Sequence, residues 1–228
     1  MKISLQFLLF AAILMFCSCA TTEQPPLKIA LVGDSTVTDS VGWGKAFAAH
    51  FNEKVTVDNF AAGGRSSKSY LAEKRLPKVL ESRPDYVFIQ FGHNDQPGKG
   101  FERETDPKTT YKFYLRIFIY QFLKNDIKPI LVSSVVRRKF DENGRIASTL
   151  TPWANAAKEL AEEMKIPFID LHTASMKYHN KIGPEESKTF NPKETDVTHF
   201  NDKGARAIAK LIIDELATEV LPLKAYLK

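Results

Sequence analysis

The chain has 228 residues, and 43% of them are hydrophobic, so it is long enough for one sizeable domain and too short for two of ordinary size. Its formal net charge of +5 weakly favours an acidic partner. Nucleic acid is a poor fit as that partner, because the N-terminus carries an export signal and no recognised nucleic-acid-binding motif occurs.

The first 19 residues predict a signal peptide rather than part of the fold. Lys2 provides a positive start, residues 5–16 are almost wholly apolar, and small residues follow at Ser18 and Ala20. The apolar run is too short for a comfortable membrane span. We therefore expect an exported bacterial protein, with a short tether at residues 20–26 and one folded domain at residues 27–228.

Both cysteines of the chain, Cys17 and Cys19, lie in this leader. The stretch "FCSC" resembles a bacterial lipoprotein cleavage site, with Cys19 as the lipidated residue that anchors the protein in the cell envelope or periplasm. Phe16 stands three places before Cys19, where such sites usually have leucine. The alternative is an ordinary signal peptide that is cleaved after Ala20 to release a secreted protein, and the lipoprotein is slightly favoured. The domain itself has no disulfide, so packing must stabilise it.

Short apolar runs alternate with longer amphipathic segments along the rest of the chain. Several of the short runs lack polar–apolar alternation, as strands buried on both faces do. They predict strands at residues 27–32, 55–60, 86–91, 129–133 and 167–171. The amphipathic segments predict helices at residues 43–51, 69–80, 107–123, 153–164 and 202–221.

The alternation of strands and helices predicts a three-layer α/β domain with a parallel sheet and right-handed crossovers. Pro152 is a plausible start of the fourth helix, and Asn201 is a plausible N-cap of the last. Long polar segments that contain glycine, proline and charged residues predict loops that could line a substrate cleft. These segments are residues 95–106, 137–151 and 181–195.

Four polar clusters stand out on this layout. "GDST" with Ser35 follows the first strand, "AAGGRSS" at residues 61–67 follows the second, and "GHND" at residues 92–95 follows the third. Open α/β sheets build their sites beyond the carboxyl ends of parallel strands, where all three clusters would lie. The fourth cluster, "DVTHFN" at residues 196–201, precedes the last helix and can reach the same edge through a loop.

The clusters together contain the parts of a serine hydrolase. A serine hydroxyl needs an adjacent base to act as a nucleophile, and His199 is the candidate base for Ser35. Asp196, three residues earlier, can return through a tight turn to orient the imidazole. Taken singly, Ser35 could be a turn or cap residue, and Asp196 with His199 could be a capping pair. The four clusters together favour catalysis.

A serine hydrolase also needs fixed donors for the oxyanion that develops during attack. The candidates are the main-chain N–H groups of Ser35 and Gly64 and the side-chain amide of Asn94. Gly64 suits close approach of a ligand because it lacks a Cβ atom, although it could serve only a tight turn. Asn94 could instead hold its own loop through an Asx turn.

Competing motifs do not fit. A nucleophile elbow needs glycine two places after its serine, where this chain has Val37. The chain contains neither a Walker phosphate-binding loop nor a His-Glu-x-x-His helix or cysteine cluster, so we expect neither a metal nor a cofactor. The remaining histidines are predicted to be structural or exposed; they are His50, His93, His172 and His179.

The four clusters resemble the blocks that define the SGNH, or GDSL-like, hydrolase superfamily, with Ser35, Gly64, Asn94 and His199 as the naming residues. The resemblance covers essentially the whole chain after the leader. It implies a flavodoxin-like fold with a five-stranded parallel sheet in the order 2-1-3-4-5. Within the superfamily, "GDSTV", "GWG", "AAGGRSSKSY" and "FGHND" look most like rhamnogalacturonan acetylesterases, which implies metal-independent removal of acetyl groups from pectin.

An acetylated acidic polysaccharide is thus the expected substrate, and a basic cleft would suit it. The candidate substrate-binding residues, each of which could equally be ordinary surface charge, are Arg65, Lys68, Arg137 and Arg138. One alternative is an esterase for acetylated xylan, small acyl esters or lipids. Another is a carbohydrate-binding lipoprotein without turnover, against which the intact Ser35, Asp196 and His199 argue.

Overall fold

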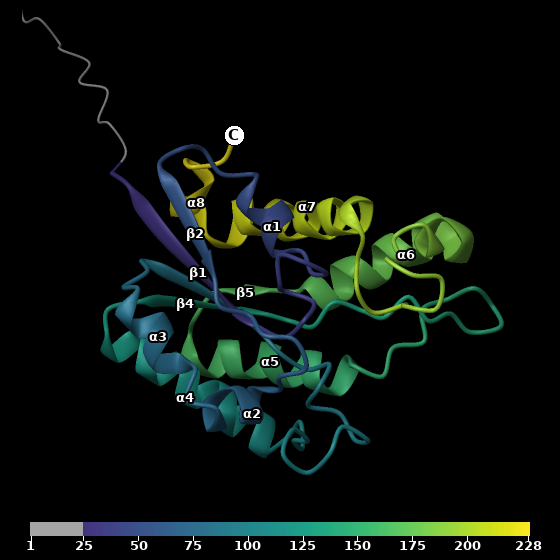
Figure 1. The fold of residues 1–228 in the computed structure, drawn as a ribbon, viewed down its shortest axis with the longest axis horizontal. Coiled ribbons are helices and arrows are strands. Elements are labelled where there is room, and N and C mark those ends of the chain that lie inside the picture. The colour runs from purple at the N-terminus through teal and green to yellow at the C-terminus, as the bar shows by residue number, and fades with distance from the viewer. Residues whose placement is uncertain (1–24) are drawn as a thin grey trace, which may run out of the picture.

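A computed structural model describes residues 25–228 of the protein. A five-stranded parallel sheet forms its centre (Figure 1). The strand order is β2-β1-β3-β4-β5, which confirms the predicted fold. The strands are β1 (Leu27–Gly33), β2 (Val55–Asn59), β3 (Tyr86–Gln90), β4 (Lys128–Val132) and β5 (Phe168–Ile169). The predicted signal peptide, Cys19 and most of the predicted tether lie outside the described residues.

The sequence patterns placed the ends of the first four strands to within one residue. β1 and β3 are central, and every residue of β3 is buried, which explains why their sequences lack alternation. β5 is much shorter than predicted. Asp170 ends it because its side chain accepts a hydrogen bond from the N–H of Thr173 and caps the next helix.

Helices cover both faces of the sheet (Figure 1). One face carries α1 (Gly44–Ala48), α7 (Asp202–Glu219) and α8 (Leu221–Lys224), whose apolar side chains share a core with β1 and β3. The other face carries α2 (Ser67–Ala72), α3 (Leu76–Glu81), α4 (Thr110–Lys124) and α5 (Thr151–Met164). As predicted, Asn201 caps α7, and α5 has its proline in the first turn.

The predicted helix at residues 69–80 is in fact two helices. Ser66 and Ser69 form a reciprocal capping box that starts α2 at Ser67, earlier than its apolar pattern indicates. Lys74 then takes a left-handed conformation, with φ of 53°, which interrupts the helix before α3. Capping and the break are local backbone events that a hydrophobic period of 3.6 residues does not encode.

The sequence patterns missed one long helix, α6 (Leu171–Lys188), which lies beside α7. Part of the predicted loop at residues 181–195 is therefore helical. Gly183 has φ of 78° and joins two helical pieces, and Pro184 opens the second of them. Glycine followed by proline predicts a loop, but here the pair produces only a kink.

Close contact between the ends of β1 and β3 sets up the functional edge. A Cβ atom on Gly33 would lie 2.5 Å from the main-chain oxygen of Gln90, so only glycine allows this approach. Gly33 pairs with Gln90 at the last rung of the sheet. The polar clusters that follow the two strands consequently emerge side by side.

Candidate active site

Ser35, His199 and Asp196 form a continuous chain of hydrogen bonds. The Nε2 atom of His199 lies 2.8 Å from the Ser35 Oγ, and its Nδ1 atom lies 2.9 Å from the Oδ2 of Asp196. Ser35 and His199 are 164 residues apart in the sequence. With Nδ1–H donating to the carboxylate, Nε2 is free to accept the serine proton, which is the arrangement that a serine nucleophile needs.

A tight turn holds Asp196 against His199. The Oδ1 atom of Asp196 accepts hydrogen bonds from the main-chain N–H groups of Thr198, at 3.1 Å, and His199, at 3.0 Å. Burial opposes ionisation of Asp196, but these hydrogen bonds and the one from the imidazole hold the pKa of its carboxyl below the usual value. The carboxylate is therefore ionised and in place to orient the ring.

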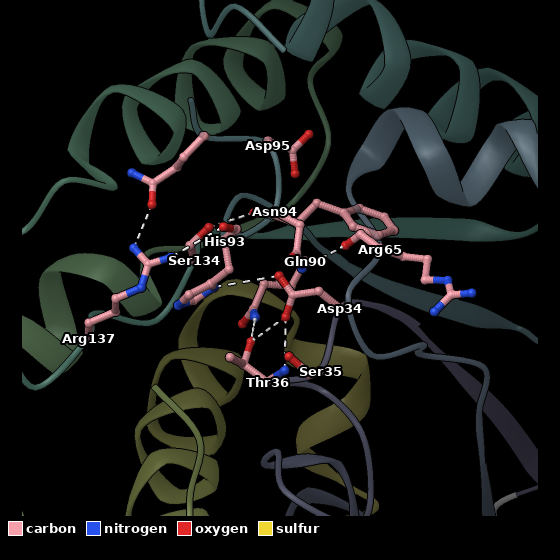
Figure 2. A network of polar contacts seen from close by, with 12 residues as sticks. Asp34, Ser35, Thr36, Arg65, Gln90, His93, Asn94, Asp95, Ser134 and Arg137 are labelled. Atoms are coloured by element: carbon pink, nitrogen blue, oxygen red, sulfur yellow. Dashed lines mark hydrogen bonds and ion pairs between the residues drawn. The ribbon is translucent and has the colours of Figure 1, made fainter. Parts of the chain in front are cut away.

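A buried network next to Ser35 fixes the turn that presents it (Figure 2). The Oδ1 of Asp34 accepts from the N–H and the hydroxyl of Thr36, at 2.9 and 2.7 Å. Gln90, at the end of β3, donates to the Thr36 hydroxyl at 2.7 Å and accepts from the Trp43 indole at 3.0 Å. Gln90 was not among the predicted site residues, although a single polar residue at the end of the apolar run "YVFIQ" could have indicated a buried hydrogen-bonding role.

His93 lies against Asp34 in the same interior. The two side chains are almost fully buried, and the Nδ1 of His93 is 3.5 Å from the Oδ2 of Asp34. Burial lowers the pKa of His93, so the ring is neutral near pH 7. The sequence placed His93 among structural histidines, and the structure puts it directly behind the edge that carries Ser35 and Asn94 (Figure 2).

The three oxyanion candidates lie on adjoining loops. Gly64 has φ of 75°, a conformation that favours glycine, and open space where a Cβ atom would be. The neighbouring Gly63 is in contact range of Ser35, since a Cβ atom there would lie 3.7 Å from the serine Cβ. Asn94 donates one amide hydrogen to the main-chain oxygen of Arg65 at 3.1 Å. Its second amide hydrogen remains for a substrate oxyanion.

Asp95 ties two of these loops together, a role that the sequence patterns did not predict. Its buried carboxylate accepts from the N–H and hydroxyl of Ser67, with the hydroxyl at 2.5 Å, and from the hydroxyl of Thr105 at 3.2 Å. Burial raises the pKa of Asp95 to about 7, against the pull of the Ser67 hydrogen bonds. Asp95 thereby links the loop of Gly64 to that of Asn94.

Arg138 is a correction to the predicted substrate-binding set. Its side chain is only 4% exposed, and its guanidinium donates to the main-chain oxygens of Asp196 and His199 and to the Asn191 side chain. Burial lowers the pKa of Arg138 to about 10, so it stays charged at neutral pH. A guanidinium that is buried against the turn of Asp196 and His199 is not accessible to a polysaccharide.

The other three basic residues occupy the surface near the edge. Arg65 pairs with Glu73, with 3.0 Å between its Nε and the carboxylate. Half-buried Arg137 donates to Gln96 at 2.5 Å and to the main-chain oxygen of His93 at 3.2 Å. In Figure 2 these two side chains extend on opposite sides of the group around Ser35 and Asn94. Lys68 lies at the start of α2.

Residues 25–228 contain no group of three or more histidine, cysteine, aspartate or glutamate side chains placed to hold a metal ion. Within the same part of the chain, no helix combines the length and apolarity that crossing a bilayer requires.

Comparison with known proteins identifies the class of enzyme. Residues 30–207 match the GDSL-like Lipase/Acylhydrolase family. The chain is 40% identical to rhamnogalacturonan acetylesterase RhgT of Bacillus subtilis, over 89% of this chain and 94% of the relative. It is 29% identical to a rhamnogalacturonan acetylesterase of Emericella nidulans, over 79% of this chain and 81% of the relative.

Solved structures show the same fold. The Bacillus subtilis protein YxiM superposes with a TM-score of 0.74 at 29% identity, over 84% of this chain and 56% of that one. The acetylxylan esterase Axe2 of Geobacillus stearothermophilus shares the fold, with a TM-score of 0.65 at 19% identity over 86% of this chain and 96% of that one. The chain belongs to the GDSL-like, or SGNH, lipase/acylhydrolase family, and it is a carboxylic ester hydrolase.

Proposed function

We propose that this protein removes O-acetyl groups from rhamnogalacturonan, an acidic pectic polysaccharide. The hydrogen-bonded chain from Ser35 through His199 to Asp196 supports ester hydrolysis by a serine nucleophile. The substrate is proposed from the relatives, because two proteins that align over most of this chain carry the name rhamnogalacturonan acetylesterase. Lys68, which has no ion-pair partner among residues 25–228, is compatible with an anionic polymer.

The proposed reaction proceeds in two halves. The Ser35 hydroxyl attacks the acetyl carbonyl while its proton passes to His199, and the oxyanion accepts hydrogen bonds from Ser35 N–H, Gly64 N–H and the Asn94 amide. The imidazolium then protonates the departing sugar hydroxyl, which leaves acetyl-Ser35. Water, deprotonated by His199, attacks this ester, and acetate leaves as Ser35 regains its proton. Asp196 orients His199 in both halves.

Acetate release from a panel of esters tests the proposal. We expect the highest kcat/KM on acetylated rhamnogalacturonan, and lower values on acetylated xylan, simple acetyl esters and lipids. The Ser35→Ala protein, which should lack activity on all of them, is the control for contaminating esterases. A higher kcat/KM on acetylated xylan or on a lipid ester would show that pectin is not the preferred substrate. Wild-type protein that is inactive on every ester would overturn the enzymatic role.

We also propose that the protein is exported and anchored by a lipid on Cys19. The apolar leader and the small residue before Cys19 support this proposal. Cys19→Ala should move the protein from the membrane fraction to the soluble fraction of the cell envelope. A soluble wild-type protein whose N-terminus is Thr21 would show cleavage after Ala20 instead, and with it a secreted enzyme.

A further inference from the structure

Phe101 is the most exposed of the large apolar side chains in the described part of the chain, at 82%. It lies at the tip of the loop between β3 and α4, which runs beside α2 in Figure 1. The carboxylate of Glu104 accepts from the main-chain N–H groups of Lys99, at 2.8 Å, and Gly100, at 2.7 Å. The loop is thus held in shape by its own hydrogen bonds, and it presents an aromatic ring to solvent.

The Lys68 side chain lies against this ring. Its Nζ atom is 4.0 Å from the centre of the Phe101 ring and donates to the Phe101 main-chain oxygen at 2.6 Å. An ammonium group has three hydrogens to donate, so two remain. No carboxylate of residues 25–228 lies within ion-pair distance of Lys68, whereas Arg65 on the same segment is paired with Glu73.

Lys68, in the first turn of α2, and Phe101, on the loop after β3, follow closely on segments that flank Ser35. Gly63 is in contact range of Ser35, and Lys68 lies five positions after Gly63. A segment of five residues spans at most about 18 Å. Phe101 follows Asn94 by seven positions, and Asn94 is hydrogen-bonded to the Arg65 carbonyl. A polymer with one acetyl group at Ser35 therefore has its neighbouring sugar units within reach of the Lys68–Phe101 pair.

We propose that Lys68 and Phe101 form a subsite for an anionic sugar ring of the same chain, a galacturonate neighbouring the acetylated residue. The carboxylate of this galacturonate accepts from the two remaining ammonium hydrogens of Lys68. The ammonium lies over one face of the Phe101 ring, so the apolar C–H face of the adjoining sugar packs on the other face. An aromatic ring alone would take any pyranose; the unpaired ammonium selects one that carries a negative charge. This proposal rests on the proposed function, since the sugar that it assigns to the subsite is a unit of the proposed substrate.

The kinetic test uses two substrates that differ only in charge: an acetylated rhamnogalacturonan oligosaccharide and the same oligosaccharide with its carboxyl groups reduced to alcohols. Lys68→Met should raise KM for the acidic substrate by about fivefold and change KM for the reduced one far less. Phe101→Ala should raise KM for both. The matched controls are Lys45→Met, an exposed lysine on α1, and Phe113→Ala, a 57%-exposed phenylalanine on α4.

Direct binding separates the subsite from the reaction. The affinity of Ser35→Ala protein for unacetylated oligogalacturonate is measured by calorimetry, with and without Lys68→Met. Weaker binding in the double variant, with a smaller difference in high salt, supports the subsite even if rhamnogalacturonan is not deacetylated, in which case only the proposed function falls. Undetectable binding by Ser35→Ala protein, or equal affinity of the two proteins, overturns the subsite, as does an unchanged KM in both single variants.

Discussion

Arg138 donates a hydrogen bond from its buried guanidinium to the main-chain oxygen of Asp196, with 3.0 Å between the two atoms. The same nitrogen also donates to the main-chain oxygen of His199, and the Arg138 Nε donates to Asn191 at 2.6 Å. The Phe200 ring lies under the guanidinium, with 4.7 Å from its centre to the Arg138 Cζ. One charged side chain thus holds both ends of the turn that carries the Asp196 carboxylate and the His199 imidazole.

Arg138→Met should lower kcat by at least about tenfold, with a smaller change in KM, because the turn loses its donors while the substrate surface is untouched. Each main-chain oxygen left unpaired in the interior costs about 1–3 kcal/mol, so the melting temperature should fall by several degrees. Arg138→Lys, which keeps the charge and one donor, should recover part of the kcat. Unchanged kcat in the methionine variant, or no recovery by lysine, would exclude this positioning role.

Ser35→Ala should abolish ester hydrolysis, with kcat reduced by at least about 10⁴-fold, because the Ser35 Oγ is the hydroxyl that contacts the His199 Nε2 among residues 25–228. The variant should stay folded, since its side chain loses one exposed-edge hydrogen bond and no packing. Acetate release and circular dichroism on the same sample measure both effects. Ser40→Ala, on the following turn, is the control, and substantial activity of a folded Ser35→Ala protein would refute the serine mechanism.

Asn94→Ala should lower kcat by about 10²–10³-fold and leave KM nearly unchanged, because a donor to the oxyanion acts mainly in the transition state. The lost hydrogen bond to the Arg65 carbonyl should add a modest decrease in melting temperature, equivalent to about 1 kcal/mol. Kinetics and thermal denaturation of one purified variant distinguish the two effects. A kcat within a few-fold of wild type would leave only the Ser35 and Gly64 N–H groups as oxyanion donors.

His179 should make the protein sensitive to acid. Burial, and then the nearby Arg138 charge, lower the pKa of His179 to about 4 from its usual 6.5. A depressed histidine pKa means that the folded state resists protonation, so its stabilising contribution is complete above pH 6.5 and is lost as the pH falls towards 4. The loss over this range should be about 3 kcal/mol.

The measurement compares wild type with His179→Asn, whose amide can replace the contact of the ring Nδ1 with the Ser187 hydroxyl at 2.9 Å. The free energies of unfolding of the two proteins, from denaturant titrations at pH 7 and pH 4.5, should differ less at the lower pH. Carboxylates that titrate in this range are present in both proteins and cancel in the difference. Parallel pH curves would mean that His179 is not the acid-sensitive group.

Prediction from sequence succeeded where the signal was local. Apolar runs defined the first four strands, since burial on both faces demands uninterrupted apolar residues. Polar residues just after three of those runs then had to meet at one edge, because parallel strands point the same way. The spacing of Asp196 and His199 likewise indicated a tight turn, which the structure shows as three hydrogen bonds from the Thr198 and His199 groups to the carboxylate.

Sequence patterns were enough to name the groups of the candidate site: a serine after the first strand, an asparagine after the third, and a histidine with its carboxylate before the last helix. Which charged residues are buried follows from the folded protein alone. Arg137 and Arg138 are adjacent in sequence, yet Arg138 is buried behind the turn of Asp196 and His199, whereas Arg137 is half-buried. The groups that accept hydrogen bonds from Arg138 lie more than 50 residues away, and burial depends on such distant neighbours, which no local pattern of polarity records.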